Sequence, residues 1–189
     1  MKHELNSQNT KQMLTDTLVS LLSKKSIAKI TVSEIVTICN VNRKTFYYHF
    51  TDVYDLFEWY LDGEVRKAIL VFDPLNDMEA TITYAVNYMN DHTYLRNCIS
   101  MPLAKERISK VLNTALSSKS LEMIHTFENA HGKCIEPDFK EFLVKALTQM
   151  TVLSILDAIE NPERYDIEKM KKYITHIFDA SINGFFEKL

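Results

Sequence analysis

Glycine and proline are scarce in this chain of 189 residues, with 3 and 4 occurrences. Average usage is roughly 7% and 5%. Doubly wound sheets, sandwiches and barrels need turn residues at each of many connections. The shortage therefore predicts an all-α protein with long helices and few turns. Because Gly63, Gly132 and Gly184 cannot form a glycine-rich phosphate loop, dinucleotide-binding and P-loop proteins are excluded.

Cysteine is too sparse for a disulfide framework. Cys39, Cys98 and Cys134 are an odd number, widely spaced and without a CxxC motif, which favours free thiols in a reducing cytoplasm. The polar N-terminus lacks the apolar core of a signal peptide. No uncharged run approaches the roughly 18 apolar residues of a membrane span. We therefore expect a soluble, cytoplasmic protein with no membrane partner.

Motifs for metal binding and catalysis are also lacking. His131 and Cys134 flank Gly132, but neither an HExxH motif nor a four-ligand set occurs. No nucleophile stands at a useful spacing from a base and an orienting group, and acids such as Asp138 and Glu141 belong on a solvated face. The sequence predicts no metal, no cofactor and no enzymatic activity.

What the sequence does have is an uneven distribution of charge. Residues 1–50 contain seven Lys/Arg and three Asp/Glu, a net charge of +4, whereas residues 51–189 contain 15 and 22, a net charge of −7. This asymmetry is expected of a small nucleic-acid-binding head on a larger sensor or partner-binding domain. An ordinary charged surface is the alternative.

Apolar spacing and capping residues divide the chain into helices. The predicted ranges are about 7–24, 32–39, 43–49, 52–71, 76–92, 94–101, 103–130, 137–160 and 166–187. Thr31 and Glu34 have the spacing of a capping box at the second helix. Asn40 suits the left-handed conformation that ends a helix, and Asn42 is a good N-cap for the third. Thr51 or Asp52 caps the fourth.

The helices predicted at 32–39 and 43–49 have the pattern of a helix-turn-helix, and the later of the two is polar and basic at its start. Such a motif places the N-terminal residues of that helix at base edges in the major groove. Arg43 can bond guanine, Lys44 can do so more loosely or hold a phosphate, and Thr45 can donate to a base or touch a thymine methyl. Phe46 and Phe50 take its buried face.

The neighbouring polar and aromatic side chains are predicted phosphate contacts. The full set of predicted DNA-binding residues is Thr31, Asn42, Arg43, Lys44, Thr45, Tyr47, Tyr48 and His49. A merely solvated helix start is the alternative, and Tyr48 can instead pack against the first helix. Lys24, Lys25 and Lys29 are predicted to add general electrostatic attraction.

Residues 27–56, IAKITVSEIVTICNVNRKTFYYHFTDVYDL, resemble the DNA-binding domain of the TetR/AcrR family of bacterial transcriptional regulators. The Thr-Phe-Tyr-Tyr-His-Phe helix carries much of this likeness. The Asn-Arg-x-Thr-Phe-Tyr form resembles a subgroup that includes activators of dihydroxyacetone-kinase operons. Two positions depart from the family pattern: Asn40 replaces a frequent Gly, and Val53 replaces a frequent Lys that meets a phosphate.

The resemblance implies a three-helix head, residues 1–50, on a helical body, residues 51–189, that senses an effector and dimerises. It implies a homodimer on double-stranded DNA, joined by the last two long helices. The apolar residues predicted to form that interface are Phe142, Leu147, Met150, Leu153, Ile174, Ile177, Phe178 and Phe185. The intramolecular core is the alternative place for these side chains, and a two-sided apolar helix would serve both.

The resemblance also implies an effector cavity in the body. The large or polar residues predicted to line it are Trp59, Tyr60, Tyr84, Asn87, Tyr88, Arg96, Met123 and His125. More often such a stripe is simply core. The expected function is sequence-specific regulation of transcription from a pseudo-palindromic operator, modulated by a small molecule. The alternative keeps the same head on a body that responds to a protein partner.

Overall fold

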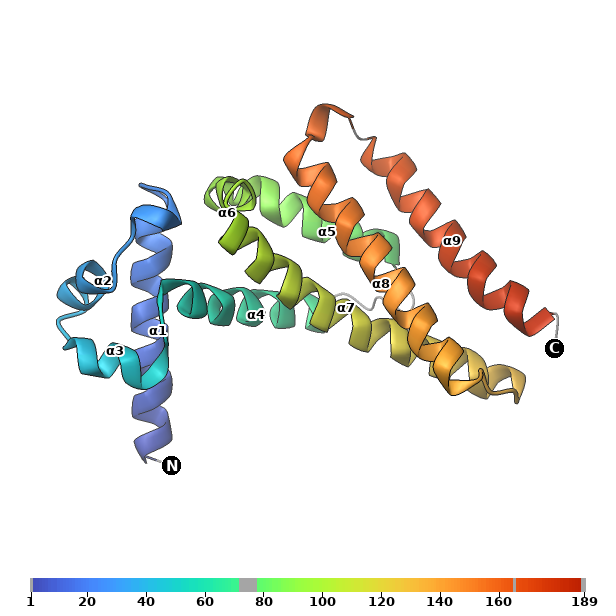
Figure 1. Ribbon diagram of the computed structural model, residues 1–189, viewed down its shortest axis with the longest axis horizontal. Coiled ribbons are helices and arrows are strands. Elements are labelled where there is room, and N and C mark those ends of the chain that lie inside the picture. Colours follow the sequence, from blue (N-terminus) through green and yellow to red (C-terminus); the bar gives the residue numbers. More distant parts are fainter. Residues whose placement is uncertain (1, 72–77, 165, 188–189) are drawn as a thin grey trace. The chain divides into compact units, whose positions relative to one another are not determined.

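The computed structural model describes residues 2–71, 78–164 and 166–187, and some side chains within these ranges, Phe185 among them, lie outside the description. Every regular element in these ranges is a helix (Figure 1). In chain order they are α1 (Lys2–Leu22), the 3₁₀ helix η1 (Ile27–Lys29), α2 (Val32–Ile38), α3 (Arg43–His49), α4 (Val53–Val71), α5 (Met78–Asp91), α6 (Thr93–Ile99), α7 (Pro102–His131), α8 (Pro137–Glu160), the 3₁₀ helix η2 (Pro162–Arg164) and α9 (Ile167–Glu187). The predicted all-α class is confirmed, and neither 3₁₀ helix was predicted.

The chain divides into two compact units. Unit 1 comprises Met1–Glu64 with His92–Ile108, and unit 2 comprises Val65–Asp91 with Ser109–Leu189. Helices α4 and α7 therefore each contribute residues to both units. The functional division at residue 50 stays a prediction.

Unit 1 contains the helix-turn-helix. Helix α2 packs against both α1 and α3 (Figure 1). Leu14 and Leu18 of α1, Ile35 of α2 and Phe46 of α3 are fully buried. Because α2 and α3 have seven residues each, they are too short to be stable alone, and this shared core holds them.

The first turns of α4 are joined to α6 and α7 within unit 1. The hydroxyls of Tyr60 and Tyr94 are 2.7 Å apart, and Arg107 donates to the Glu58 carboxylate. Burial, followed by the hydrogen bond with Tyr60, raises the pKa of Tyr94 well above its ordinary value. Burial raises the pKa of Cys98 to about 11. At neutral pH the Tyr94 hydroxyl and the Cys98 thiol are therefore uncharged, and Arg107 and Glu58 add an ion pair to this joint.

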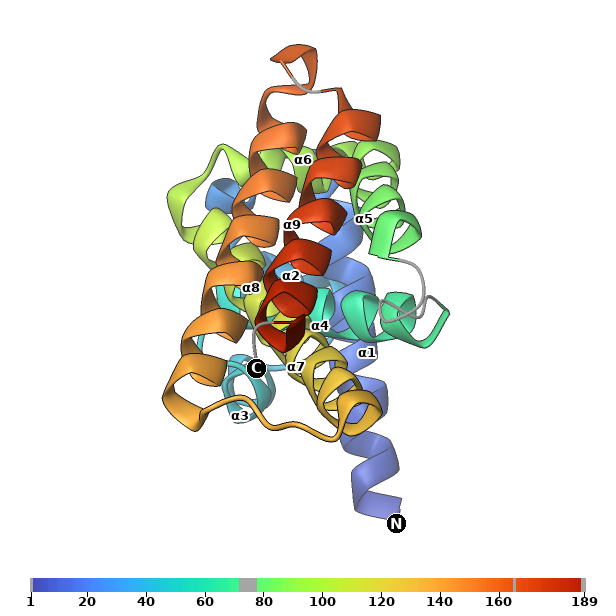
Figure 2. The same cartoon turned by 90° about the vertical axis from the view of Figure 1, so that its right-hand side faces the viewer.

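Unit 2 is a helical bundle in which α5 packs against both α8 and α9. Helices α8 and α9 run side by side (Figure 2). Val86 of α5, Val152 and Ile155 of α8, and Ile174 and Phe178 of α9 are among its buried residues. Within the described ranges, α8 alone has the length and hydropathy of a membrane span, but more than half of that window is buried inside the protein, as in a core helix.

Glu128 of α7 is a buried carboxylate, 6% exposed, that ties α7 to the start of α8. It accepts hydrogen bonds from Lys140 Nζ at 2.8 Å and from the Ile135 amide at 2.6 Å, and lies 3.0 Å from His125 Nδ1. Burial raises the pKa of this carboxyl, but the hydrogen bonds from Lys140, Ile135 and His125 lower it by more, so the pKa lies below its usual 4.5.

Replacing this carboxylate, Glu128→Gln, should lower the free energy of unfolding by about 1–3 kcal/mol at pH 7, because Lys140 loses its counter-charge. Since the folded-state pKa is depressed, the contribution is complete above the unfolded-state value of about 4.5 and is lost as pH falls through the folded-state pKa. Urea unfolding followed by far-UV circular dichroism should therefore show a wild-type advantage that shrinks below about pH 4.5.

The matched control is Glu122→Gln on the same helix. Glu122 is half exposed and pairs with Lys119 at 2.7 Å, so its loss should change the free energy of unfolding by less than about 0.5 kcal/mol. Equal stability of the two variants at pH 7 would contradict the account of Glu128.

Candidate nucleic-acid interface

The N-terminus of α2 is capped as predicted, but only half of the predicted capping box forms. Thr31 Oγ1 accepts a hydrogen bond from the Glu34 amide at 3.3 Å. The Glu34 carboxylate accepts from Lys25 Nζ instead of returning to the Thr31 amide. A charge-assisted bond to an ammonium is stronger than one to a backbone amide. Lys25 is therefore paired within the protein, and the general electrostatic attraction predicted for it stays a prediction.

The turn between α2 and α3 follows the prediction. Asn40 has a φ of 52°, the left-handed conformation that ends α2. Asn42 caps α3, and its Oδ1 accepts from the Thr45 amide at 2.7 Å and from the Thr45 hydroxyl at 3.1 Å. The Asn42 side-chain NH₂ remains available at the exposed start of α3. These caps fix where α3 begins and thus which residues its first turn presents.

Helix α3 separates a buried aromatic face from an exposed polar one. Phe46 and Phe50 are 0% and 4% exposed, whereas Tyr47 and Tyr48 are 50% and 78% exposed. Tyr48 therefore does not pack against α1. Arg43 and Lys44 are exposed in the first turn, and Thr31 is exposed at the start of α2, while Thr45 and His49 are partly buried. The eight predicted DNA-binding residues thus lie on or beside the two helices of the motif.

The guanidinium of Arg43 is held between two helices. Its Nη1 donates to Ser33 Oγ of α2 at 3.1 Å, and its Nη2 donates to the Tyr47 hydroxyl at 3.3 Å. The guanidinium carbon lies 5.9 Å from the centre of the Tyr47 ring. Ser33 was not among the predicted residues. No local sequence signal points to it, because it lies ten positions from Arg43 and meets it only through the turn.

The surroundings of His49 favour its neutral form. Burial, and then the nearby Lys11 ammonium, hold the pKa of His49 below its ordinary value of 6.5. Its ring forms an edge contact with Tyr48, with the ring centres 4.9 Å apart. A neutral imidazole can still donate one N–H to a phosphate oxygen.

The start of α4 is fixed by acids instead of being anchored by a lysine. Asp52 Oδ1 accepts from the Asp55 amide at 2.8 Å, and the Asp55 carboxylate accepts from the Thr51 amide at 2.8 Å and the Thr51 hydroxyl at 3.1 Å. Of the two predicted caps, Asp52 is the one that caps the helix. Val53 is buried at 7% exposure, so its side chain cannot supply the phosphate contact of the frequent lysine.

Residues 14–59 match the sequence model of bacterial regulatory proteins of the tetR family, a span that contains α2, the turn, α3 and the start of α4. This part of the chain is a TetR-family DNA-binding domain. The resemblance seen in residues 27–56 is thereby confirmed. Regulators of the TetR family bind DNA and usually act as dimers.

Solved structures show the same fold. The dihydroxyacetone kinase operon activator DhaS matches with 14% identity and a TM-score of 0.63, covering 92% of this chain and 96% of that one. A tetR-family transcriptional regulator from Streptomyces coelicolor matches with 15% identity and a TM-score of 0.59, over 92% and 80%. The fatty acid degradation regulator FadR from Bacillus halodurans matches with 11% identity and a TM-score of 0.58, covering 89% of this chain and 93% of that one.

At these identities the likeness carries the TetR fold alone, so the likeness to activators of dihydroxyacetone-kinase operons stays a prediction. Among curated proteins, none matches this chain.

The predicted effector residues of this TetR-family chain fall into both units. Trp59, Tyr60 and Arg96 belong to unit 1, and Tyr84, Asn87, Tyr88, Met123 and His125 belong to unit 2. Trp59 packs in the head, 6.0 Å from the Phe50 ring and beneath Lys11. Tyr60 is hydrogen-bonded to Tyr94, Tyr84 packs on Tyr88, and His125 pairs with Glu128. Met123 is buried, whereas Asn87 and Arg96 are exposed.

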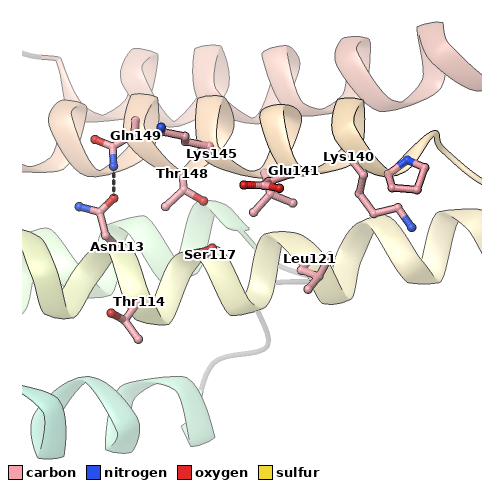
Figure 3. A pocket seen from close by; sticks show the side chains of 11 residues that line it. Asn113, Thr114, Ser117, Leu121, Lys140, Glu141, Lys145, Thr148 and Gln149 are labelled. Carbon is pink, nitrogen blue, oxygen red and sulfur yellow. Dashed lines mark hydrogen bonds between the residues drawn. The ribbon is translucent and has the colours of Figure 1, made fainter.

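A different set of residues lines an open groove between α7 and α8. Its volume is about 630 Å³, and its lining residues are Asn113, Thr114, Ser117, Leu121, Pro137, Lys140, Glu141, Val144, Lys145, Thr148 and Gln149. Asn113 and Gln149 meet across the groove in a hydrogen bond of 2.6 Å (Figure 3). None of the eight predicted effector residues lines this groove.

The predicted dimer residues divide by exposure. Phe142, Leu153 and Ile177 are 66%, 62% and 42% exposed, whereas Leu147, Ile174 and Phe178 are at most 4% exposed within unit 2. Met150 is intermediate, and the side chain of Phe185 lies outside the description. The three buried residues belong to the core of unit 2, so the exposed ones remain as the candidate interface. Phe139 and Tyr173 are also exposed and are added to it.

Proposed function

We propose that this TetR-family regulator binds a pseudo-palindromic operator as a homodimer and reads its sequence with α3. One observation carries the proposal: the Asn42-capped helix α3 buries Phe46 and Phe50 and presents Arg43 and Lys44 in its exposed first turn. The first turn of such a helix is the part that reaches base edges in the major groove.

The exposed groups divide into base-reading and phosphate-binding sets. Arg43 and Lys44 offer donors to guanine O6 and N7, and the Thr45 methyl and hydroxyl can meet a thymine or another base edge. Tyr47, Tyr48, His49 and Thr31 offer hydroxyl and N–H donors to phosphate oxygens, which fix register without reading sequence, and the NH₂ of Asn42 can serve either group. This division predicts which substitutions alter specificity and which alter affinity alone.

The proposal is tested by a fluorescence-anisotropy titration of the full chain against its own upstream intergenic DNA and a scrambled duplex of the same length. Saturable binding that prefers the native duplex and weakens steeply between two salt concentrations supports a sequence-specific regulator, because phosphate contacts release counterions. Equal and weak binding to both duplexes counts against it.

We propose further that α8 and α9 pair with the same helices of a second copy. The support is the exposure of five large side chains on these two helices, Phe139, Phe142, Leu153, Tyr173 and Ile177, and we propose that they form one apolar face. Five large apolar side chains on two neighbouring helices are more than the scattered exposure that is normal for a monomer. A dimer with two-fold symmetry is the assembly that a pseudo-palindromic operator requires, because its half-sites lie about one DNA turn apart.

Replacing one of these side chains, Phe142→Glu, is expected to weaken dimerisation at least about tenfold, because a charge would be desolvated between two apolar faces. Sedimentation velocity over a range of concentrations measures the monomer–dimer equilibrium. The control is Leu103→Glu in α7, which is 57% exposed but outside this face. Dimerisation that is unchanged in Phe142→Glu, or equally weakened in both variants, would contradict this placement.

We propose that a small molecule modulates DNA binding through unit 2, and the α7–α8 groove supports this. Its volume falls in the range of small-molecule sites, and the exposed charged residues Glu141 and Lys145 of α8 are among its lining residues. The eight predicted effector residues remain the alternative location. An effector acts only by its differential affinity for two arrangements of the protein.

The alternative function is a body that responds to a protein partner. Native mass spectrometry of the protein purified without denaturation separates the two functions. A discrete small-molecule adduct that denaturation removes supports an effector. If the adduct persists in Lys145→Ala, the effector is assigned to the predicted residues instead of the groove. A co-purifying protein would favour the alternative function.

A further inference from the structure

Arg43 is oriented by hydroxyl groups and by no carboxylate. Its two terminal nitrogens donate to Ser33 Oγ and to the Tyr47 hydroxyl, at 3.1 and 3.3 Å. Among the described residues, no Asp or Glu forms an ion pair with it. A carboxylate would compete with DNA for the guanidinium charge, whereas a neutral hydroxyl leaves that charge available.

We propose that Ser33 is a positioning residue for sequence reading, which holds Arg43 in the orientation that meets one base pair. This inference rests on the proposed function. Ser33 itself need not touch a base, because its effect passes through the guanidinium that it orients. Tyr47 supplies the second support, so the residue predicted to bind phosphate also steadies the residue predicted to read a base.

The donor count permits both roles at once. A guanidinium carries five N–H groups in a fixed fork, and Ser33 and Tyr47 accept one each. The remaining donors are enough for the paired bonds to guanine O6 and N7. The Tyr47 hydroxyl accepts from Arg43 and so keeps its own proton for a phosphate oxygen. The number of donors therefore allows Arg43 to bind DNA while it keeps both supports.

Ser33 also stands on a rigid element. It lies in the first turn of α2, whose N-terminus is capped by Thr31 and whose Ile35 is fully buried. The Thr37 hydroxyl bonds the Ser33 carbonyl at 2.8 Å. A long side chain that is held by such a support loses less conformational freedom on binding than a free one, which affects affinity by about three- to tenfold.

The test uses the full chain and the duplex that the wild-type protein selects from a random pool. The measured quantity is the ratio of the Kd values for each single base-pair substitution and for the selected duplex. In Ser33→Ala this ratio should fall about three- to tenfold at one base pair, the same pair at which Arg43→Ala acts. Ser33→Thr keeps the hydroxyl and should restore the ratio.

The control is Ser23→Ala, which removes an exposed hydroxyl that bonds only the Ser20 carbonyl, and it should leave every ratio unchanged. If Ser33→Ala weakens binding to all duplexes equally, Ser33 is a phosphate contact and the inference is wrong. If the wild-type protein selects no preferred sequence, the proposed function itself fails. Unfolding curves of the single tryptophan, Trp59, verify that each variant is folded.

Discussion

Replacing Phe46 by alanine is expected to destabilise the DNA-binding head by about 3–5 kcal/mol and to abolish specific DNA binding. Phe46 is fully buried and contacts the rings of Tyr47 and Phe50, at 5.6 and 6.0 Å between ring centres. Helix α3 has only seven residues, so it cannot persist once its anchor is lost. A loss of this size is a large fraction of the 5–15 kcal/mol that stabilises a typical domain.

The single tryptophan provides the measurement. Trp59 packs on Phe50 with 6.0 Å between ring centres, so its fluorescence reports unfolding of the head, whereas far-UV circular dichroism reports the whole chain. Tyr48→Ala is the control, because Tyr48 lies on the same helix at 78% exposure; it should change the free energy of unfolding by less than about 0.5 kcal/mol and still weaken DNA binding. A Phe46→Ala head as stable as the Tyr48→Ala head would contradict this core.

Removing the Arg43 side chain is expected to relax base preference, with a loss of about 1–3 kcal/mol at one base pair. Arg43 is exposed in the first turn of α3 and is held in place by Ser33 and Tyr47. Arg43→Ala removes the donors that discriminate guanine but leaves the helix start intact, because Asn42 caps α3 independently. Anisotropy titrations on the preferred duplex and its single base-pair variants measure the effect.

Lys29→Ala is the matched control for charge. Lys29 is exposed in η1, outside the first turn of α3, and should contribute only general attraction. Its removal is expected to weaken binding to all duplexes by a similar factor and to flatten the salt dependence. If Arg43→Ala behaves in the same way, Arg43 contacts a phosphate and the assignment of base reading is wrong.

Local structure could be predicted well because its causes are local. The left-handed Asn40 and the Asn42 cap depend on side chains that act on their own backbone neighbours, and the spacing of Phe46 and Phe50 states which face of α3 is buried. The capping box failed in part because a third residue, Lys25, is nine positions from Glu34 and captures its carboxylate. The spacing of Thr31 and Glu34 alone cannot predict that a donor from another segment competes for the carboxylate.

Tertiary features could not be predicted for a related reason. The bond between Ser33 and Arg43 depends on the angle between two helices. Periodicity identified the apolar residues of α8 and α9, but Leu147 points into unit 2 whereas Phe142 remains exposed. A wide apolar stripe does not tell which part meets the core. Tyr60 and Trp59 likewise have apolar and polar atoms that suit a ligand or a protein neighbour equally.

We propose above all that a dimer of this TetR-family regulator reads DNA sequence through α3. Selection of duplexes from a random pool by the wild-type protein, followed by sequencing, tests it most directly. We expect an inverted repeat whose half-sites are centred about 34–36 Å apart, and Arg43→Ala should lose the preference at one position of each half-site. Enrichment of no sequence, or of a motif without two-fold symmetry, would contradict it.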